Sequence, residues 1–395
     1  MDALILVANP GSASRKYALY QGGALRGSLH FEFENGQVVC TVNKNSRRRR
    51  IKTGVKNFNL AIKYLISLLY KSRLLNPSED IDAIGIRVVA AGKFFTGDHL
   101  VNEVFIKELE KARETAPLHI QTIMDEVREL FKVFKTTEIV AVSDSAFHAN
   151  RPERTMNYAI SAKLAKRFDI KRWGYHGISM SSVVSTLRSD KRYHKLDKVV
   201  VAHLGSGCSI TGLKNWQSFD TSMGYSPLEG LMSSTRSGSI DVVAALKIKK
   251  AFKMNDAQLE VLLNKGSGLL AVSEKSDDIR TLQKLAKTGN EKAELALEMF
   301  VYRAVSEIGR MITAVGGVYA LVFTGTVGER SFIIRDQIID GLRFLGFRLA
   351  EKVNLSTVDP ENVVEVSTRK SPLILVVPTN ENAEIARRTL EFIDD

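Results

Sequence analysis

The sequence predicts an α/β fold composed of two similar halves, and three features support this prediction. Short apolar runs typical of buried strands alternate with amphipathic patterns typical of helices. A strand, a small Gly/Ser loop and a second strand occur at the start of the chain and again near its middle. The length of 395 residues, at about 150 residues per domain, is sufficient for two or three domains.

The first half opens with an apolar run at residues 4–7, which predicts a buried strand. This run stops at the sequence NPGSAS over residues 9–14, and a second strand is predicted at residues 16–20. A helix is then predicted from apolar residues that recur at intervals of three or four positions: Phe58, Ile62, Leu65, Ile66 and Leu69.

The second half repeats the strand, loop and strand arrangement. Residues 199–202 predict a buried strand that leads into the loop HLGSGCS at 203–209, and a second strand follows at 210–213. A helix around Leu259 is predicted between an N-cap at Asn255 and a stop at Gly266.

A third glycine loop follows another predicted strand. Residues 318–324 form a buried-strand pattern that breaks at GTVGE over 325–329, before an amphipathic helix that contains Ile334 and Ile338. A glycine turn between a strand and a helix presents backbone N–H groups to an anion or a nucleotide. Each loop alone is weak evidence, but three such loops together favour a nucleotide-binding cleft.

The basic charge is compatible with several kinds of anionic partner. The formal net charge is +12, and a positive field attracts nucleic acid as well as nucleotides, acyl phosphates and other small anions. The densest basic run is the four arginines at 47–50, which predict an exposed hairpin tip or sheet edge. No aromatic residues are interleaved with them, so a solvated basic segment is favoured and a nucleic-acid partner is disfavoured.

Composition also bears on the compartment. The longest apolar stretch, near residues 62–70, is broken by Lys63 and falls short of the roughly 20 apolar residues that a membrane span needs. No basic segment precedes the first apolar run, which argues against a secretory signal. Cys40 and Cys208 make no disulfide framework and, as two thiols alone, no structural zinc site. We therefore expect a cytoplasmic protein without a membrane segment.

Several blocks of sequence, in order along nearly the whole chain, resemble the acetate kinases. Residues 9–16 resemble the first signature of that family and residues 201–210 resemble the second. The longest match is DTSMGYSPLEGLM at 220–232, which continues to TRSG at 235–238. Further blocks that match are APLH at 116–119, DSAFH at 144–148, WGYHG at 173–177 and PTNE at 378–381.

The resemblance implies a duplicated actin-like fold, with two similar domains around a nucleotide cleft. It places an N-terminal domain at 1–147, completed by a C-terminal helix at 382–395, and a C-terminal domain at 148–381 that carries the nucleotide site and a dimer interface. The implied activity is reversible, Mg²⁺-dependent phosphoryl transfer between ATP and acetate, giving acetyl phosphate and ADP. A homodimer is also implied.

The chemistry of this reaction favours arginines over a general base. A carboxylate with a pKa near 4 is already ionised at neutral pH, so its activation requires no proton removal. The carboxylate and the γ-phosphate are both anions, and the enzyme must hold them in line while neutralising the transferring group. A planar guanidinium binds either anion with paired hydrogen bonds.

By resemblance, five residues have catalytic roles. Arg87 and Arg236 align with the substrate and phosphoryl arginines, whereas a surface or ion-paired arginine is the alternative for each. His176 aligns with the histidine that donates to the transferring phosphoryl group, and His119 aligns with a supporting histidine; either is otherwise a hydrogen-bonded core histidine. Asp144 aligns with an essential acidic residue, and its alternative role is a helix or turn cap.

The resemblance also assigns ligand contacts. Asn9 and Glu381 align with the Mg²⁺-associated pair, and Mg²⁺ prefers oxygen ligands and keeps several waters. The acyl pocket is assigned to Val89, Leu118, Tyr175 and Pro227, with Arg87 binding the carboxylate. The nucleotide is assigned to Ser12, Ser14, Lys16, His203, Gly205, Ser206, Gly207, Asp278, Ile279, Arg280, Gly325, Thr326, Val327, Gly328 and Glu329.

Some positions depart from the family pattern. Ala90 and Ala91 replace part of a histidine-containing motif, and Ser239 replaces an aspartate. Ala13 stands where the first loop usually has a serine, and Tyr175 replaces a phenylalanine in the acyl pocket, adding a hydroxyl that requires a partner. No charged catalytic residue is lost, so activity is expected to survive.

Two other functions remain open from the sequence. A propionate or butyrate kinase differs only in the volume of the acyl pocket. A catalytically weakened homologue that binds nucleotide or nucleic acid is the alternative from another class. The joint presence of Asn9, Arg87, Asp144, His176, Arg236 and Glu381 argues against the weakened homologue.

Overall fold

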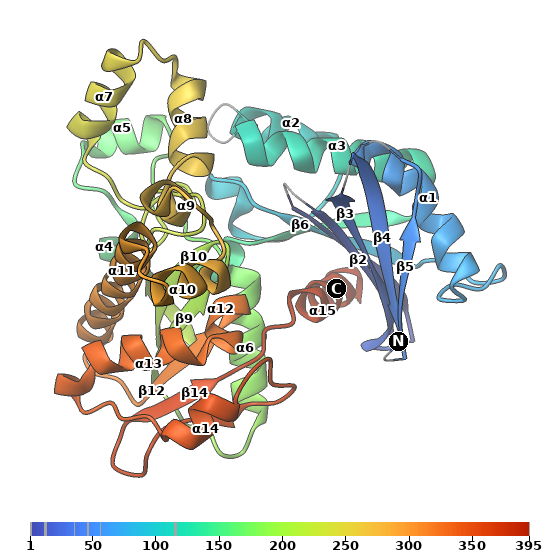
Figure 1. Cartoon of the computed structure of the whole chain (residues 1–395). Helices are drawn as coiled ribbons and strands as arrows, with labels where there is room; N and C mark the ends of the chain where they lie inside the picture. The colour runs from blue at the N-terminus through green and yellow to red at the C-terminus, as the bar shows by residue number, and fades with distance from the viewer. Residues whose placement is uncertain are drawn as a thin grey trace. The chain divides into compact units, whose positions relative to one another are not determined.

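The computed structural model describes residues 2–11, 14–34, 36–45, 47–55, 57–113 and 117–394, without the side chains of 59–61 and 117–119 (Figure 1). The chain divides into two compact units, which are described separately below. Unit 1 comprises Met1–Ala146 and Asn380–Asp395, and unit 2 comprises Phe147–Thr379.

Unit 1 is built on an eight-stranded sheet in the order β5-β4-β3-β2-β1-β6-β8-β7. Strands β1 to β5 form an antiparallel meander, whereas β1, β6 and β8 are parallel neighbours. The strands are β1 (Leu4–Pro10), β2 (Ser14–Gln21), β3 (Ala24–Glu34), β4 (Gln37–Lys44), β5 (Arg47–Lys52), β6 (Ala83–Val88), β7 (His99–Leu100) and β8 (Glu138–Ser143).

The helices of unit 1 are α1 (Phe58–Lys71), α2 (Glu103–Arg113), α3 (Pro117–Val133) and α15 (Glu381–Asp394), with a 3-10 turn at Lys93–Thr96. Apolar residues of α1, α2 and α3 form one core with the sheet. The C-terminal helix α15 packs on β1 and β6. Gly85 of β6 permits this approach, because a Cβ there would overlap the Thr389 hydroxyl.

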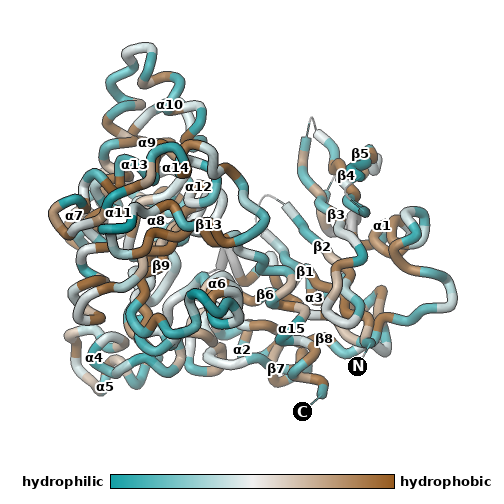
Figure 2. Tube along the Cα trace, turned by 90° about the horizontal axis from the view of Figure 1, so that it is seen from below, coloured by the Kyte–Doolittle hydropathy of each residue, from teal (hydrophilic) through white to brown (hydrophobic). Residues whose placement is uncertain are grey.

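Unit 2 is built on a six-stranded sheet in the order β11-β10-β9-β12-β14-β13. Its strands are β9 (Lys198–Leu204), β10 (Cys208–Lys214), β11 (Gln217–Thr221), β12 (Ala320–Thr324), β13 (Val364–Glu365) and β14 (Leu373–Val376). The apolar run of β9 is largely brown in Figure 2 and is buried from Val199 onward. Strand β9 pairs antiparallel with β10 and parallel with β12, as β1 pairs with β2 and β6.

Unit 2 has helices on both faces of its sheet. Helix α6 packs on one face, and α10, α11 and α13 pack on the other. The remaining helices are short or lie beside these layers. In order, the helices of unit 2 are α4 (Glu153–Met156), α5 (Ala162–Arg167), α6 (Gly177–Ser189), α7 (Val242–Ala251), α8 (Asp256–Lys265), α9 (Gly268–Ser273), α10 (Ile279–Lys287), α11 (Glu291–Val315), α12 (Gly325–Arg330), α13 (Phe332–Gly341) and α14 (Glu351–Ser356), with 3-10 turns at Ala146–His148 and Arg343–Leu345.

The predicted duplication is confirmed by the strand order. Five strands of unit 1, in the order β3-β2-β1-β6-β8, have the same connectivity as β11-β10-β9-β12-β14 of unit 2. The sheet of each half therefore begins with the hairpin that the Gly/Ser loops predicted. The Asn255 cap of α8 is also confirmed, since Asn255 and Gln258 form a reciprocal capping box.

Two local predictions are refined by the structure. The glycine segment at 325–329 is itself the short helix α12, and a second helix, α13, follows it. The arginines at 47–50 lie in β5, an exposed strand at the edge of the sheet of unit 1. Of the helices in the described ranges, none has both the length and the apolar character that a membrane crossing requires.

Candidate functional site

The first group of predicted residues lies in unit 1 around Arg87, near the end of β6. The Arg87 guanidinium donates from Nη2 to Asp144 Oδ2 at 3.1 Å and from Nη1 to Glu381 Oε2 at 3.2 Å. Asp144 directly follows β8, where its N–H donates to the Val88 carbonyl at 2.9 Å. Because β6 and β8 are parallel, their carboxyl ends bring these two side chains to the same edge of the sheet.

The charges around Arg87 are closely balanced. Asp144 is fully buried, and the side chain of Arg87 is 20% exposed. Burial opposes the charge on Arg87, but the carboxylates of Asp144 and Glu381 outweigh this effect and raise its pKa above the ordinary arginine range. Arg87 Nε is buried and has no hydrogen-bond partner among the described residues. A cation held in place with an unused donor is suited to bind an anionic ligand.

Asn9 brings amide and carboxylate oxygens to the same group. It lies near the end of β1, and its Nδ2 is 3.3 Å from both Glu381 Oε2 and Asn382 Oδ1. No cluster of three or more His, Cys, Asp or Glu side chains suited to a metal occurs in the described ranges. A site with one amide and one carboxylate fits Mg²⁺, which is commonly bound by few protein ligands together with waters and substrate phosphates.

The second group lies in unit 2 around two histidines. His176 is the N-cap of α6 and adopts a left-handed backbone conformation with φ of 60°. Its Nδ1 lies 3.0 Å from Ser209 Oγ, while His203 Nδ1 lies 2.8 Å from Ser179 Oγ. The two imidazole ring centres are 4.3 Å apart. Each ring is therefore oriented by a buried serine through Nδ1.

The glycine loop after β9 lies against these residues. A Cβ at Gly207 would lie 3.0 Å from Arg236 Nη1 and 3.2 Å from His176 Nε2. A Cβ at Gly205 would lie 3.8 Å from His203 Nε2 and 3.9 Å from the backbone nitrogen of Thr326. Gly205 and Gly207 have no side chains, so their backbone lies directly beside a guanidinium and two imidazoles. This arrangement is suited to binding phosphate oxygens.

Two other residues that are predicted to contact the nucleotide, Asp278 and Glu329, form hydrogen bonds to backbone groups of the protein. Asp278 is the N-cap of α10 and accepts from the backbone of Arg280 at 2.8 Å, while also pairing with the Arg280 guanidinium. Glu329 accepts from the N–H groups of Gly325 at 2.8 Å and Thr379 at 3.2 Å. Gly325 has φ of +78°, and a Cβ there would lie 2.7 Å from the Leu204 carbonyl.

The predicted acyl contacts are divided between the two units. Val89 belongs to unit 1, whereas Tyr175 and Pro227 belong to unit 2. Tyr175 is 2% exposed, and its hydroxyl donates to the Tyr225 carbonyl at 2.6 Å. The hydroxyl that replaces the usual phenylalanine edge therefore has a backbone partner.

The predicted residues thus form two groups, one in each unit, and several predicted residues lie outside both groups. Unit 1 brings together Asn9, Arg87, Asp144 and Glu381, and unit 2 brings together His176, His203, Gly205, Gly207 and Arg236. Ser14 and the exposed Lys16 are on β2 of unit 1. Ile279, Val327 and Gly328 lie in α10 and α12, and Ser206 accepts at its carbonyl from Ser234 N at 3.3 Å. Ser12 and the side chains of Leu118 and His119 lie outside the described residues.

Sequence reasoning missed the residues that orient these groups. Ser209 and Ser179 bond the two histidines, and Asn382 lies beside Asn9. Ser209 was within a family signature, and Ser179 follows His176 by three positions, so both were adjacent to recognised motifs. Nothing in the local sequence indicated which of several serines would face an imidazole.

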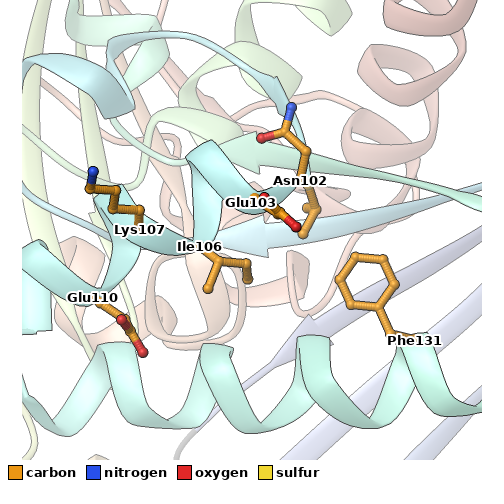
Figure 3. A pocket seen from close by; sticks show the side chains of 7 residues that line it. Asn102, Glu103, Ile106, Lys107, Glu110 and Phe131 are labelled. Atoms are coloured by element: carbon orange, nitrogen blue, oxygen red, sulfur yellow. The ribbon is translucent and has the colours of Figure 1, made fainter.

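Unit 1 also has a surface hollow that involves none of the predicted site residues. It has a volume of about 550 Å³ and is lined from α2 and α3. Figure 3 shows Ile106 and Phe131 projecting into it, with Glu103, Lys107 and Glu110 nearby. Its mixed charge and apolar floor match neither an anion site nor a metal site.

The similarity to known proteins extends over nearly the whole chain. The model of the Acetokinase family matches residues 4–387. Acetate kinase 2 of Neisseria meningitidis serogroup B is 37% identical over 396 residues, covering 99% of this chain and 98% of that protein. An acetate kinase of Thermoanaerobacterium thermosaccharolyticum is 36% identical, covering 99% of each.

Two solved structures of this kind of kinase also have the same fold as this chain. The acetate kinase of Porphyromonas gingivalis superposes with a TM-score of 0.86 at 30% identity, covering 99% of this chain and all of that one. A propionate kinase from Francisella tularensis superposes with a TM-score of 0.90 at 31% identity, covering 98% and 99%. These likenesses confirm the duplicated actin-like fold.

Proposed function

The chain belongs to the acetokinase family, and we propose that it is an acetate kinase that transfers a phosphoryl group reversibly between ATP and acetate. The observation that carries this proposal is the cluster of Asn9, Arg87, Asp144 and Glu381 at the carboxyl ends of β1, β6 and β8. It offers a fixed cation with a free buried donor for a carboxylate, beside oxygen ligands for a metal.

The transfer step follows from the charges of the reactants. A carboxylate oxygen of acetate attacks the γ-phosphorus, the bond from phosphorus to the bridging oxygen breaks, and ADP leaves with that electron pair. No proton is moved in this step, because acetate is already ionised. Catalysis then consists of holding two anions in line and stabilising charge on the transferring oxygens.

We assign the cations of each unit separately. Arg87 would bind the acetate carboxylate, with Asp144 and Glu381 holding the guanidinium in place. In unit 2, Arg236 Nη1 and His176 Nε2 would donate hydrogen bonds to the transferring phosphoryl group, since both atoms lie beside Gly207. Both groups act on the same pair of reactants in this proposal. Units 1 and 2 would be the two domains of the duplicated fold.

A magnesium ion would be held by Asn9 and Glu381. When bound, it would neutralise the ATP phosphates and orient the γ-phosphoryl group. The glycine loop at 205–207 and His203 would contact the phosphates, and α10 with α12 would contact the nucleoside.

The acyl group would be enclosed by Val89, Leu118, Tyr175 and Pro227. The similarity to a propionate kinase makes propionate the second candidate substrate. Since the Tyr175 hydroxyl is already bonded to Tyr225, it adds no unpaired polar atom to this pocket.

The decisive experiment is an assay of the purified protein with ATP, Mg²⁺ and acetate, propionate or butyrate, in which the acyl phosphate is trapped with hydroxylamine. We expect acetate to give the highest kcat/KM, propionate a lower value and butyrate little product. Chelation of the metal should abolish turnover. Absence of acyl phosphate with every carboxylate would refute the proposal, and a preference for butyrate would refute the choice of acetate.

We further propose that the protein is a homodimer that associates through unit 2. Helix α7 has no buried residue, and its Val242 and Val243 are 70% and 72% exposed. Leu246 and Phe252, on and after the same helix, are also exposed. Several large apolar side chains exposed on one short helix are typical of a surface that a partner covers.

A further inference from the structure

We propose that Tyr158, Glu229 and Arg172 are positioning residues that hold the turn at 225–227 and thereby set the acyl-chain length the enzyme accepts. The inference rests on the proposed function, because it takes Tyr175 and Pro227 as walls of the acyl pocket. All of these residues belong to unit 2.

The first observation is that two tyrosine hydroxyls form hydrogen bonds to the backbone N–H and carbonyl of one residue, Tyr225. The hydroxyl of Tyr175 donates to the Tyr225 carbonyl at 2.6 Å. The N–H of Tyr225 donates to the Tyr158 hydroxyl at 2.9 Å. Tyr225 lies only two residues before Pro227, so its backbone is fixed directly beside the proposed wall.

The second observation is that Tyr158 is itself held by an ion pair. Its hydroxyl donates to Glu229 Oε2, and the guanidinium of Arg172 donates from Nη1 to Glu229 Oε1. Arg172 Nη2 also donates to the Thr221 carbonyl at 3.0 Å. The network therefore joins the chain before the turn, at Thr221, to the chain after it, at Glu229.

The Tyr158 hydroxyl serves both as a donor and as an acceptor. Burial raises the pKa of Tyr158 well above its ordinary value, so its hydroxyl keeps its proton and donates it to Glu229. The Tyr158 oxygen is then left to accept from Tyr225. The space beside Gly224 is also filled, because a Cβ there would overlap both the Glu229 carboxylate and the Tyr158 hydroxyl.

The consequence concerns substrate selection. An acyl chain longer by one methylene has to displace a pocket wall or leave the carboxylate out of line. With Tyr225 held at both its N–H and its carbonyl, movement of Pro227 requires breaking two partly buried hydrogen bonds. A rigid wall therefore favours acetate over propionate, whereas a loosened wall reduces that preference.

The test compares three tyrosine variants that each remove one oxygen atom. Tyr158→Phe and Tyr175→Phe break the two bonds to Tyr225. Tyr193→Phe is the matched control, since Tyr193 is a buried tyrosine of unit 2 whose hydroxyl has no hydrogen-bond partner in the described part of the chain. For each protein, kcat and KM are measured with acetate and propionate, and KM is measured for ATP.

We expect the ratio of propionate to acetate kcat/KM to rise about fivefold to tenfold in Tyr158→Phe, within the range that one methylene can contribute. A rise in the same direction is expected in Tyr175→Phe. KM for ATP should stay within about twofold, because none of the residues that the network joins is assigned to the nucleotide. Tyr193→Phe should leave the ratio unchanged.

The outcomes separate this inference from the proposed function. A wild-type protein that phosphorylates no carboxylate overturns the proposed function and the inference with it. An active wild type whose ratio is unchanged in Tyr158→Phe overturns the inference alone. If Tyr158→Phe does not fold, Glu229→Gln replaces it, since this change weakens the Arg172 pair and alters the acceptor for Tyr158. An unchanged ratio in that variant overturns the inference equally.

Discussion

Arg87 lies between two carboxylates, whereas Arg236 lies beside a glycine loop, and these different surroundings predict different effects of removing each side chain. Arg87 neutralises the buried Asp144 and the partly exposed Glu381. Arg236 Nη1 is placed against Gly207, where a bound phosphate would reach it. Arg87 therefore holds two carboxylates in place, and we propose that Arg236 contacts the phosphates.

We predict that Arg87→Ala and Arg236→Ala both abolish most turnover but differ in stability. Loss of Arg87 leaves two neighbouring carboxylates without their cation, so the free energy of unfolding should fall by about 3–5 kcal/mol. Loss of Arg236 should lower kcat by about 100-fold or more with a clearly smaller loss of stability. Urea unfolding and steady-state kinetics of the two variants provide the comparison. Equal destabilisation would contradict this distinction.

We predict that Gly207→Ala impairs phosphoryl transfer while the fold is retained. The added methyl would lie 3.0 Å from Arg236 Nη1 and 3.2 Å from His176 Nε2, in the space proposed for phosphate. The KM for ATP should therefore rise or kcat should fall, by about tenfold or more. Gly309→Ala is the matched control, because a Cβ in that part of α11 meets nothing within 4 Å. If both variants keep full activity, the phosphate assignment of this loop is wrong.

At the scale of elements, α13 supports α12 through one buried side chain. Arg335 is fully buried and donates to the carbonyls of Gly328 at 2.8 Å and Glu329 at 3.0 Å, at the end of α12. It also donates to the carbonyls of Asn354 and Thr357, at the end of α14. Burial lowers the pKa of Arg335 to about 10. One cation thus satisfies carbonyls at the C-terminal ends of two helices.

We predict that Arg335→Met lowers the free energy of unfolding by about 3 kcal/mol or more, because several buried carbonyls lose their donor. Arg330→Met is the control: Arg330 pairs with Asp359 at 2.8 Å, but both side chains are more than half exposed. Its removal should cost less than about 1 kcal/mol. Chemical denaturation of both variants tests the difference, and similar losses would show that Arg335 does not organise these helix ends.

At the scale of the whole molecule, the duplicated fold presents different residues at the equivalent edge of its two sheets. In each unit, the strand that starts the hairpin lies beside parallel strands, so candidate ligand-binding residues collect at their carboxyl ends. Unit 1 places acids around one arginine there, whereas unit 2 places histidines and a glycine loop. Unit 2 alone carries α7 with its exposed apolar residues.

We predict a dimer in solution that a charge on α7 dissociates. Light scattering should give twice the chain mass of 43.9 kDa for the wild type. Val243→Glu should shift the protein toward the monomer, because it places a carboxylate in an interface that excludes water. Val104→Glu is the control, since Val104 of α2 is 62% exposed in unit 1. A wild type that scatters as a monomer at micromolar concentration would refute the dimer.

Periodicity and turn residues determined most of the architecture from the sequence alone. The apolar runs at 4–7 and 199–202, each followed by a Gly/Ser loop, specified the starting hairpins of both units, because strands and turns depend on neighbouring residues. The family resemblance also singled out Arg87, Asp144 and Glu381, and the structure joins them by hydrogen bonds although they are separated by up to 294 positions. Local patterns could not distinguish a glycine turn at 325–329 from the short helix α12.

Only the tertiary structure decided which polar groups are satisfied by one another. The sequence showed that Tyr175 carries an extra hydroxyl, but the partner of that hydroxyl, the Tyr225 carbonyl, lies 50 positions away. In the same way, no pattern indicated that Ser209 and Ser179 orient the two histidines or that Arg335 bonds two helix ends. The physical reason is that a hydrogen bond depends on distance and direction between atoms, and folding brings these atoms together from segments that are remote in the chain.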